Sequence, residues 1–479
     1  MTQTPSHRCS IVPPHMLERL AASAEPQVAL AAQQALIDVD RGLRPSPGVT
    51  ATPGARQSDL THSTLEAGPV RLISDARNGT ELPGDQVRGE GDPDTGDVAV
   101  TEAYDGLGHT WQLFAEAFQR NSLDNQGLPL RATVHYGRDY ENAFWDGTQM
   151  VFGDGDGTLF TRFTASLDVI GHELSHGVVE YTAGLIYQGQ PGALNESVSD
   201  VFGSLVRQRA TGQDAASADW LIGADLLIGE AEGMALRSMK EPGTAYDTPI
   251  LGKDPQPGHM DDYVDTDADH GGVHINSGIP NKAFYLLATG LGGNAWEAPG
   301  AIWYATITGP GIAADCDFVT FAGLTQRAAT DLYGADSAEA AAVTQAWQQV
   351  GVLAPEPAEP EDPTGQDPDE IVAAGPVGDL AAASAVGTER IEVTRSGGFA
   401  GRTVSTVVAL DELPDPIADA WRALLYGGTL QALDDGAPAV PDSFCYGVAC
   451  EVPRVRVTIP EQQLPSEMKN LFDTTLRSG

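Results

Sequence analysis

The first half of the chain alternates between strand-like and helix-like spacing of its apolar residues. Alternation at every second position predicts strands over 70–74, 131–134 and 149–153, the last two on either side of the apolar run at 142–145. Between the first two strands, 101–122 has the apolar spacing of a helix, with Ala103, Leu107, Trp111, Phe114 and Phe118 three or four positions apart. We therefore expect a β-rich lobe in this part of the chain.

From residue 196 to residue 352 the chain is mostly helical in its spacing. Four stretches carry a helical repeat, at 281–289, 298–307, 318–332 and 338–350. An earlier stripe also predicts a helix, made by Leu167, Val169, Ile170, Leu174, Val178 and Val179. This order predicts an α+β protein with two lobes, in which a helical C-terminal lobe follows the β-rich lobe and the stripe-bearing helix lies between them.

Two polar stretches divide the chain into parts. Residues 43–65 are rich in Pro, Gly, Ser and Thr, and residues 354–370 hold five prolines and seven acidic residues in seventeen positions. Such compositions are typical of exposed linkers. The expected organisation is an N-terminal module at 1–50, a linker at 51–68, a main domain at 69–353, a linker at 354–374 and a C-terminal domain at 375–479.

The two outer parts have patterns of their own. Residues 16–37 have helical spacing and follow Ile11-Val12-Pro13-Pro14-His15. In the C-terminal domain, strand-like runs at 390–395, 405–409 and 454–459 accompany one helix at 415–425, where Asp415 suits the N-cap and Pro416 the first turn. We expect this domain to be a small α+β unit.

Composition excludes several classes of partner. The net charge is −40, from 27 basic and 67 acidic residues, so neither nucleic acid nor an anionic membrane is an expected partner. No apolar run is long enough for a secretory signal or a membrane span, which predicts a cytoplasmic protein or export by another route. The four cysteines make no disulfide framework. Cys445 and Cys450 are close enough in sequence to form a disulfide, and the alternative is that both remain free thiols.

The strongest chemical signal is His172-Glu173-Leu174-Ser175-His176. On a helix, residues four apart differ by about 400° of rotation, so the two imidazoles share one face and can hold one divalent metal, most often zinc. Glu173 does not share that face and suits a general base for the attacking water. After nineteen intervening residues comes Glu196, which can be the third ligand, with Asp200 four positions later on the same helical face.

These motifs and their surroundings resemble the thermolysin family of zinc endopeptidases. The run from 171 to 202, GHELSHGVVEYTAGLIYQGQPGALNESVSDVF, matches that family's double-helix zinc site. The run 142–145 resembles its substrate-binding edge strand, and 271–278 resembles the segment with its second catalytic histidine. The likeness spans roughly residues 70 to 353. It implies a neutral endopeptidase that takes peptide and protein substrates.

The resemblance implies a role for each matching residue. His172, His176 and Glu196 would hold zinc, while Asp200 and Asn195 would orient the two histidines. Tyr187 and His274 would stabilise charge on the scissile carbonyl oxygen, with Asp269 orienting His274. Asn142, the backbone at Ala143, and Arg237 would hold the substrate. The pocket after the cleaved bond would be formed by Phe160, Val169 and Leu236, which are all apolar, so cleavage is expected on the N-terminal side of hydrophobic residues.

Calcium is the point at which this sequence departs from the family. Of five carboxylates at the family's paired calcium site, Asp168 and Asp219 are present, but Arg207, Leu221 and Ala224 stand at the other positions. An arginine at a calcium-ligand position predicts that this site is lost. The sequence does not decide whether the protein has other calcium sites. The Gly- and Asp-rich run at 153–157 lacks the length and glutamate of an EF-hand and is expected to form a tight turn.

The outer parts carry two weaker resemblances. The N-terminal module resembles the short propeptide of the protealysin-like branch of the family, which is removed on maturation; Cys9 there could be a zinc-binding thiolate in the precursor or, more simply, a spare cysteine. The run 391–401 resembles the opening strand and loop of emfourin-type inhibitors of protealysin-like peptidases. Restraint by the C-terminal domain, recruitment of substrate by it, and a catalytically silent scaffold are the alternatives that the sequence leaves open.

Overall fold

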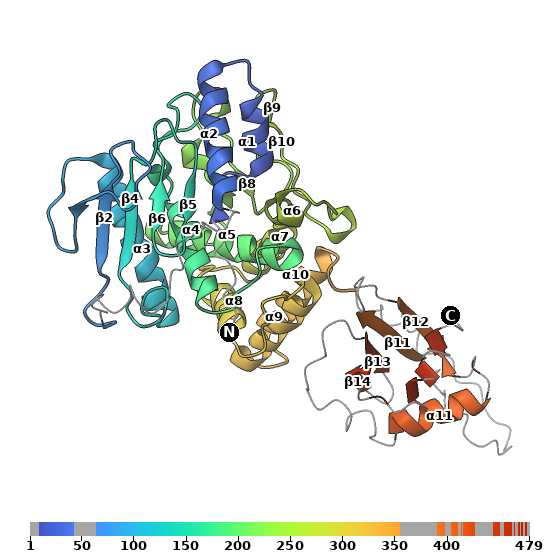
Figure 1. The fold of residues 1–479 in the computed structure, drawn as a ribbon. Coiled ribbons are helices and arrows are strands. Elements are labelled where there is room, and N and C mark those ends of the chain that lie inside the picture. The colour runs from blue at the N-terminus through green and yellow to red at the C-terminus, as the bar shows by residue number, and fades with distance from the viewer. Residues whose placement is uncertain are drawn as a thin grey trace, which may run out of the picture. The chain divides into compact units, whose positions relative to one another are not determined.

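A computed structural model describes residues 9–42, 64–354, 390–397, 404–410, 413, 415–426, 444–450, 455–461, 464, 468–469, 471–472 and 475–476. The chain divides into two compact units, Met1–Glu361 and Asp362–Gly479, each of which is described by itself. In the first unit, a strand-rich lobe is followed along the chain by a helical lobe (Figure 1). The expected α+β fold with two lobes and a further small domain is confirmed. No described helix is long and apolar enough to cross a membrane.

A six-stranded sheet forms the first lobe, in the order β1-β5-β6-β4-β2-β3. Its strands are β1 Cys9–Ser10, β2 Arg71–Asp75, β3 Asp85–Arg88, β4 Leu130–Val134, β5 Ala143–Trp145 and β6 Met150–Phe152. β2, β4 and β6 are parallel neighbours, and the other pairs are antiparallel. The expected strands are all present, whereas β1 and β3 were not predicted because neither has an alternating apolar pattern.

The helix α3, Val98–Phe118, packs against this sheet. Its N-cap is Asp97, whose carboxylate accepts from the backbone N–H of Val100 at 3.2 Å. The expected helix at 101–122 ran four residues too far, because Gln119 has a left-handed backbone with φ of 55° that ends the helix. The turn expected at 153–157 lies slightly later in the chain, over 156–160: the Asp156 carboxylate accepts from the backbone N–H groups of residues 158 to 160, and the Gly157 N–H donates to the Phe160 carbonyl.

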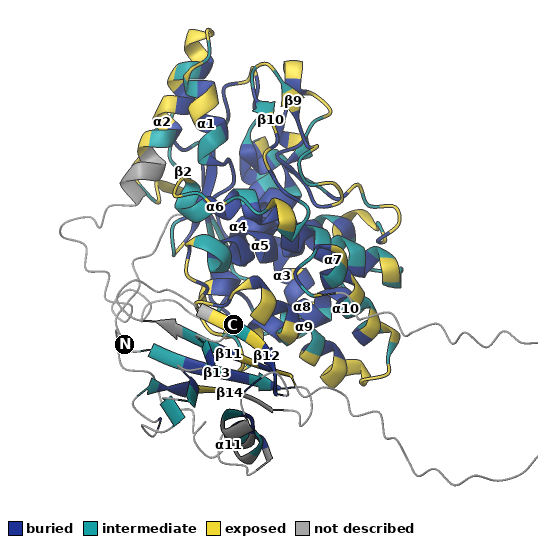
Figure 2. Cartoon of the chain, turned by 90° about the vertical axis from the view of Figure 1, so that its right-hand side faces the viewer, coloured by how far each residue is buried: buried dark blue, intermediate teal, exposed yellow. Residues whose placement is uncertain are grey.

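Two long helices lie at the centre of the first unit. They are α4 Leu167–Glu180 and α5 Gly189–Thr211, and both are mostly buried (Figure 2). Around them are the helices α6 Asp269–Asn276, α7 Gly278–Leu291, α8 Ala298–Thr308, α9 Phe318–Tyr333 and α10 Ala338–Gln349. Two short antiparallel strand pairs precede α6 in the chain: β7 Leu221–Ile222 with β8 Arg237–Ser238, and β9 Asp247–Thr248 with β10 Gly252–Lys253. The indole rings of Trp303 and Trp347 stack in the helical core with centroids 6.0 Å apart.

The N-terminal module forms two helices rather than the one expected over 16–37. They are α1 Pro14–Ala21 and α2 Pro26–Gly42. The break falls before Pro26, because a proline disfavours helical geometry in the residue that precedes it and has no N–H to continue a helix. Met16, Leu17 and Leu20 are fully buried in the same hydrophobic core as the central helices, so the module belongs to the first unit.

The C-terminal unit contains a four-stranded antiparallel sheet in the order β12-β11-β13-β14. Its described elements are β11 Arg390–Gly397, β12 Val404–Ala409, α11 Asp415–Tyr426, β13 Phe444–Cys450 and β14 Val455–Pro460. Trp421 of α11 is fully buried, stacks on Phe472 at 4.9 Å and donates from its indole N–H to Thr475 at 2.8 Å. The strand β13 was not predicted, and most of the expected loop at 396–401 lies outside the described residues, as does the linker from 355 to 374.

Cys445 and Cys450 both lie on β13, and no disulfide joins them. Five positions along one strand separate their Cα atoms by roughly 16 Å and place the side chains on opposite faces, which excludes a disulfide between them. Of the two alternatives that the sequence left open, the structure therefore excludes the pairing of Cys445 with Cys450.

Candidate active site

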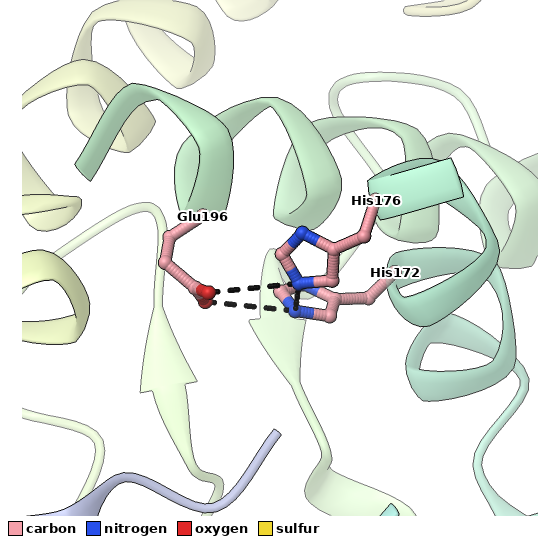
Figure 3. A group of neighbouring side chains, drawn as sticks. All are labelled: His172, His176 and Glu196. Atoms are coloured by element: carbon pink, nitrogen blue, oxygen red, sulfur yellow. Dashed lines mark hydrogen bonds and ion pairs between the residues drawn. The ribbon is translucent and has the colours of Figure 1, made fainter. Parts of the chain in front are cut away.

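Three side chains from the two central helices meet at one point. His172 and His176 lie on α4 and Glu196 on α5, and the three point toward one another (Figure 3). The two histidine Nε2 atoms are 3.0 Å apart, and each lies 3.5 to 3.6 Å from an oxygen of Glu196. The helices approach closely through Gly203, where a Cβ would lie 2.4 Å from the carbonyl oxygen of Asp168.

The second nitrogen of each imidazole is held by a neighbour. His172 Nδ1 lies 2.8 Å from an Asp200 carboxylate oxygen, and His176 Nδ1 lies 2.8 Å from the Asn195 side-chain oxygen. Both Nδ1 atoms therefore carry the proton and donate it, which leaves both Nε2 lone pairs facing the same point. Ser199 Oγ also lies 3.1 Å from His176 Nδ1, a contact that sequence reasoning missed although Ser199 is four residues from Asn195 on the same helix.

The three facing groups suit a divalent cation. The Oε2 atom of Glu196 is buried without a hydrogen-bond partner among the described residues. Two imidazole lone pairs and this carboxylate repel one another unless a positive charge lies between them, and they form the nitrogen and oxygen ligand set that zinc prefers. Burial lowers the pKa of His176 to about 4, which keeps it in the neutral form that binds metal. Burial alone would raise the pKa of Glu196, but the nearby histidines and Arg237 hold it at about 2.

Glu173 lies beside this group, at the position expected for a general base. One carboxylate oxygen accepts from the backbone N–H of Trp145 at 3.0 Å, and the other, Oε1, has no hydrogen-bond partner among the described residues. Burial, together with the negative charge of Glu196, raises the pKa of Glu173 well above its usual value. A buried carboxylate with one fixed and one free oxygen can take a proton from a water molecule within hydrogen-bond reach of the free oxygen.

A second cluster of donors faces Glu196 from the other side. The Tyr187 hydroxyl donates to Glu196 Oε1 and lies 3.2 Å from His274 Nε2. His274 Nδ1 lies 2.6 Å from Asp269, which also accepts from the His274 backbone N–H at 2.8 Å. Burial opposes protonation of His274, yet the charges of Asp269 and Glu196 raise its pKa to about 9. His274 is therefore a positively charged donor at neutral pH.

Arg237 connects the metal-ligand group to the N-terminal module. Its guanidinium donates two hydrogen bonds of 2.8 Å to Asp200, the same carboxylate that orients His172. Asn281 donates to Asp200 as well, at 2.8 Å. Arg237 is almost fully buried, and its remaining nitrogen points at a backbone carbonyl of the N-terminal module. Sequence reasoning did not find Asn281, because nothing in its local pattern marks it.

The N-terminal module lies across the site as an extra strand. β1 pairs antiparallel with β5, so that Cys9 is opposite Trp145 and Ser10 opposite Phe144. The backbone N–H of Ile11 donates to the Ala143 carbonyl at 3.2 Å, and the N–H of Val12 donates to the Asn142 side chain at 3.1 Å. The edge strand β5 is therefore covered, in the way that an extended peptide adds to a sheet edge.

Cys9 is buried beside the site but does not join the ligand group. It packs against Tyr187 and Val273. Among the described residues, only His172, His176 and Glu196 bring their ligand atoms within 4.8 Å of one another. Burial raises the pKa of the Cys9 thiol well above its usual value, and the charge of Glu196 adds to the effect. This geometry favours the simpler of the two interpretations of Cys9, a packed thiol.

The residues expected to line the apolar pocket are buried, and an arginine with three carboxylates is found at the expected calcium position. Phe160, Val169 and Leu236 are fully buried in the hydrophobic core that extends through the first unit. The Arg207 guanidinium lies 3.4 to 3.5 Å from three carboxylates. These carboxylates belong to Asp168, Asp219 and Asp225, the last of which was not found from the sequence.

Comparison with known proteins places three family models on the chain. The thermolysin metallopeptidase catalytic domain matches residues 66–180, the thermolysin metallopeptidase alpha-helical domain matches 183–352, and Emfourin matches 393–476. An extracellular metalloprotease of Pectobacterium carotovorum subsp. carotovorum is 51% identical over 350 residues, which cover 72% of this chain and 96% of that protein. Protease PrtS of Photorhabdus sp. (strain Az29) is 50% identical over 71% of this chain and 91% of its own length.

A solved structure is similar over the same part of the chain. It is the precursor of protealysin, a metalloproteinase from Serratia proteamaculans. The sequences are 52% identical, the TM-score is 0.64, and the match covers 72% of this chain and all of that one. The similarity therefore extends beyond the peptidase lobes to the length of a precursor.

Proposed function

Because the chain belongs to the thermolysin family of metallopeptidases, we propose that His172, His176 and Glu196 hold the zinc ion of its active site. Membership of this family means that the protein is a zinc-dependent endopeptidase that is produced as a precursor. The observation that carries the assignment is the pair of imidazole Nε2 atoms 3.0 Å apart, facing a buried Glu196 oxygen that has no partner among the described residues.

Catalysis then rests on groups that are already in place. Bound zinc would supply Lewis acidity that lowers the pKa of the attacking water. Glu173 takes the proton of that water through its free oxygen, while the Trp145 N–H fixes the other oxygen. His274 and the Tyr187 hydroxyl donate to the carbonyl oxygen of the cleaved bond as negative charge develops on it. Asp269 fixes His274 in its donor orientation.

The substrate lies antiparallel to β5 as an added strand. Its backbone groups bond to the Ala143 carbonyl, the Asn142 side chain and the Arg237 guanidinium. The residue after the cleaved bond enters the apolar pocket of Phe160, Val169 and Leu236, so cleavage occurs before hydrophobic residues. The N-terminal module blocks the same contacts in the precursor, which supports its role as a propeptide that is removed to produce the active enzyme.

The test of these roles is Glu173→Gln. The amide keeps the size of the side chain but cannot accept the water's proton, so turnover of a short peptide should fall by about a hundredfold or more. Bound zinc should stay at one per chain, since Glu173 is not a ligand. Full activity of the Glu173→Gln enzyme would contradict the assignment. Removal of residues 1 to about 50 from Glu173→Gln protein, in a host without other proteases, would show that maturation is not self-catalysed.

The loss of a calcium site and the export of the protein are further parts of the proposal. Arg207 supplies positive charge between Asp168, Asp219 and Asp225, which supports the loss of the paired calcium site. The Pectobacterium relative is an extracellular metalloprotease, which supports export of this protein as well. Peptides and proteins are the expected substrates, and the net charge of −40 argues against nucleic acid as a partner.

The C-terminal unit, which matches Emfourin, restrains the peptidase in this proposal. The acidic, proline-rich stretch that begins at residue 354 tethers it at an effective concentration on the order of millimolar, so even a weak inhibitor would be largely bound. Residues 1–353 should then cleave a short peptide faster than the full chain, after equal removal of the N-terminal module. Equal turnover, with no inhibition by added 375–479, would exclude restraint. Recruitment of substrate instead predicts slower cleavage of proteins by 1–353 and unchanged cleavage of peptides.

A further inference from the structure

The N-terminal segment contacts the proposed catalytic and substrate-binding residues in a definite register. The Ser10 carbonyl oxygen is 3.0 Å from His274 Nε2, and the next carbonyl, of Ile11, accepts from Arg237 at 3.0 Å. Two consecutive N–H groups, of Ile11 and Val12, bond to Ala143 and Asn142. Two carbonyls and two N–H groups in sequence fix both the direction and the register of the segment, because a shift by one residue would exchange their faces.

Each of these contacts belongs to a group with a role in the proposed reaction. His274 is the donor to the carbonyl oxygen of the cleaved bond, and it holds the Ser10 carbonyl. Arg237 holds the carbonyl of the following residue. The side chain of that residue, Ile11, has no exposed surface and lies in the hydrophobic core that extends through the first unit. The segment therefore runs through the cleft as a substrate would.

We propose that the peptide bond between Ser10 and Ile11 is a self-cleavage site of the precursor, distinct from any cut near residue 50. The proposal rests on the proposed function. Water adds its oxygen to the Ser10 carbonyl carbon, the C–N bond to Ile11 breaks, and Glu173 passes the proton of the water to the Ile11 nitrogen. The products are a peptide ending in the Ser10 carboxylate and a chain that begins at Ile11.

Cleavage there does not free the active site. Val12 is fully buried, and beyond it α1 places Met16, Leu17 and Leu20 in the core of the first unit. These contacts lie on the C-terminal side of the cut and are unchanged by it. The shortened chain therefore keeps 11–42 in the cleft as a retained product, and the enzyme stays inhibited until that piece is removed by a second cut.

The experiment follows the zinc-loaded full chain by intact mass and N-terminal sequencing. We expect a species that begins at Ile11, with release of the peptide MTQTPSHRCS, before or without a rise in turnover of an unrelated short peptide. The rate per chain should be unchanged on tenfold dilution, because the segment lies in the cleft of its own chain. The Glu173→Gln chain should form this species at least about a hundredfold more slowly.

Ile11→Asp places a carboxylate in the buried pocket and should abolish the cut, whereas Leu30→Asp, at a position that is 69% exposed on α2, should leave it unchanged. A synthetic peptide of residues 1–20, incubated with matured enzyme, tests the same bond independently of how Ile11→Asp folds. Cleavage of the unrelated peptide while Ser10–Ile11 stays intact in both chain and synthetic peptide would overturn this inference and leave the proposed function standing. Failure to cleave any peptide would overturn the proposed function itself.

Discussion

Replacing Ile11 by alanine should loosen the N-terminal segment and raise the activity of the uncleaved precursor. Ile11 is fully buried in the hydrophobic core of the first unit, and its backbone bonds to Ala143 and Arg237. The substitution keeps these backbone bonds and removes only apolar side-chain atoms. Its effect therefore isolates the contribution of the pocket to the restraint.

The magnitude follows from the buried side chain. Isoleucine to alanine removes three carbon groups from the core, at about 0.8 kcal/mol each, or about 2.4 kcal/mol in total before any cavity term is added. At about 1.4 kcal/mol per tenfold change, the open fraction of the precursor should rise about 50-fold. Turnover of a short peptide by the precursor should increase by the same factor for as long as the closed form predominates.

The assay is the initial rate of short-peptide hydrolysis by full-length chain, taken while intact mass shows no loss of N-terminal residues. Leu30→Ala is the matched control, because Leu30 is exposed on the neighbouring helix α2. A cooperative thermal unfolding transition confirms that the variant is folded. An initial rate within twofold of the unmodified precursor would refute the account of the segment as a pocket-bound inhibitor.

Two further predictions concern buried and half-buried charges. Hydrogen bonding to Asp154 raises the pKa of His135 to about 9, so its stabilising effect is fully present below about pH 6.5 and is lost as pH rises through 9. Solvent screening of this half-exposed pair limits the effect to about 1 kcal/mol. In urea unfolding, the free energy of unfolding of His135→Gln should therefore be lower than that of the unmodified protein by this amount at pH 6 and equal to it near pH 10. An equal difference at both pH values would contradict the linkage. Arg207→Ala removes the positive charge beside the fully buried Asp168 and should lower the free energy of unfolding by about 3 kcal/mol in the same assay.

Most of the fold could be predicted from the helical spacing of apolar residues and from short-range motifs. The central helices could be predicted because His172, His176 and Glu196 need fixed helical positions, and their flanks carry apolar stripes. The strands β2, β4, β5 and β6 were predictable from alternation. The structure differs where a local feature overrides a longer pattern, as at Pro26, which divides one expected helix into two.

The rest of the site depends on contacts between residues far apart in the chain. β1 is two residues long and has no apolar alternation, so its pairing with β5 could not be predicted from its own sequence. Asn281 contacts Asp200 from another helix, and Asp225 joins Arg207 from a separate turn, without any motif at either position. Such contacts are set by tertiary packing, which a single sequence does not display.

Metal content and activity measured together test the central claim most directly. The matured enzyme should contain one zinc per chain, lose hydrolysis of a short peptide when a chelator removes the metal, and regain it when zinc is restored in stoichiometric amount. His176→Ala should lower both zinc content and activity, since it removes one of the three ligands. A metal-free preparation that keeps full activity would contradict the assignment of His172, His176 and Glu196 as the zinc site of this peptidase.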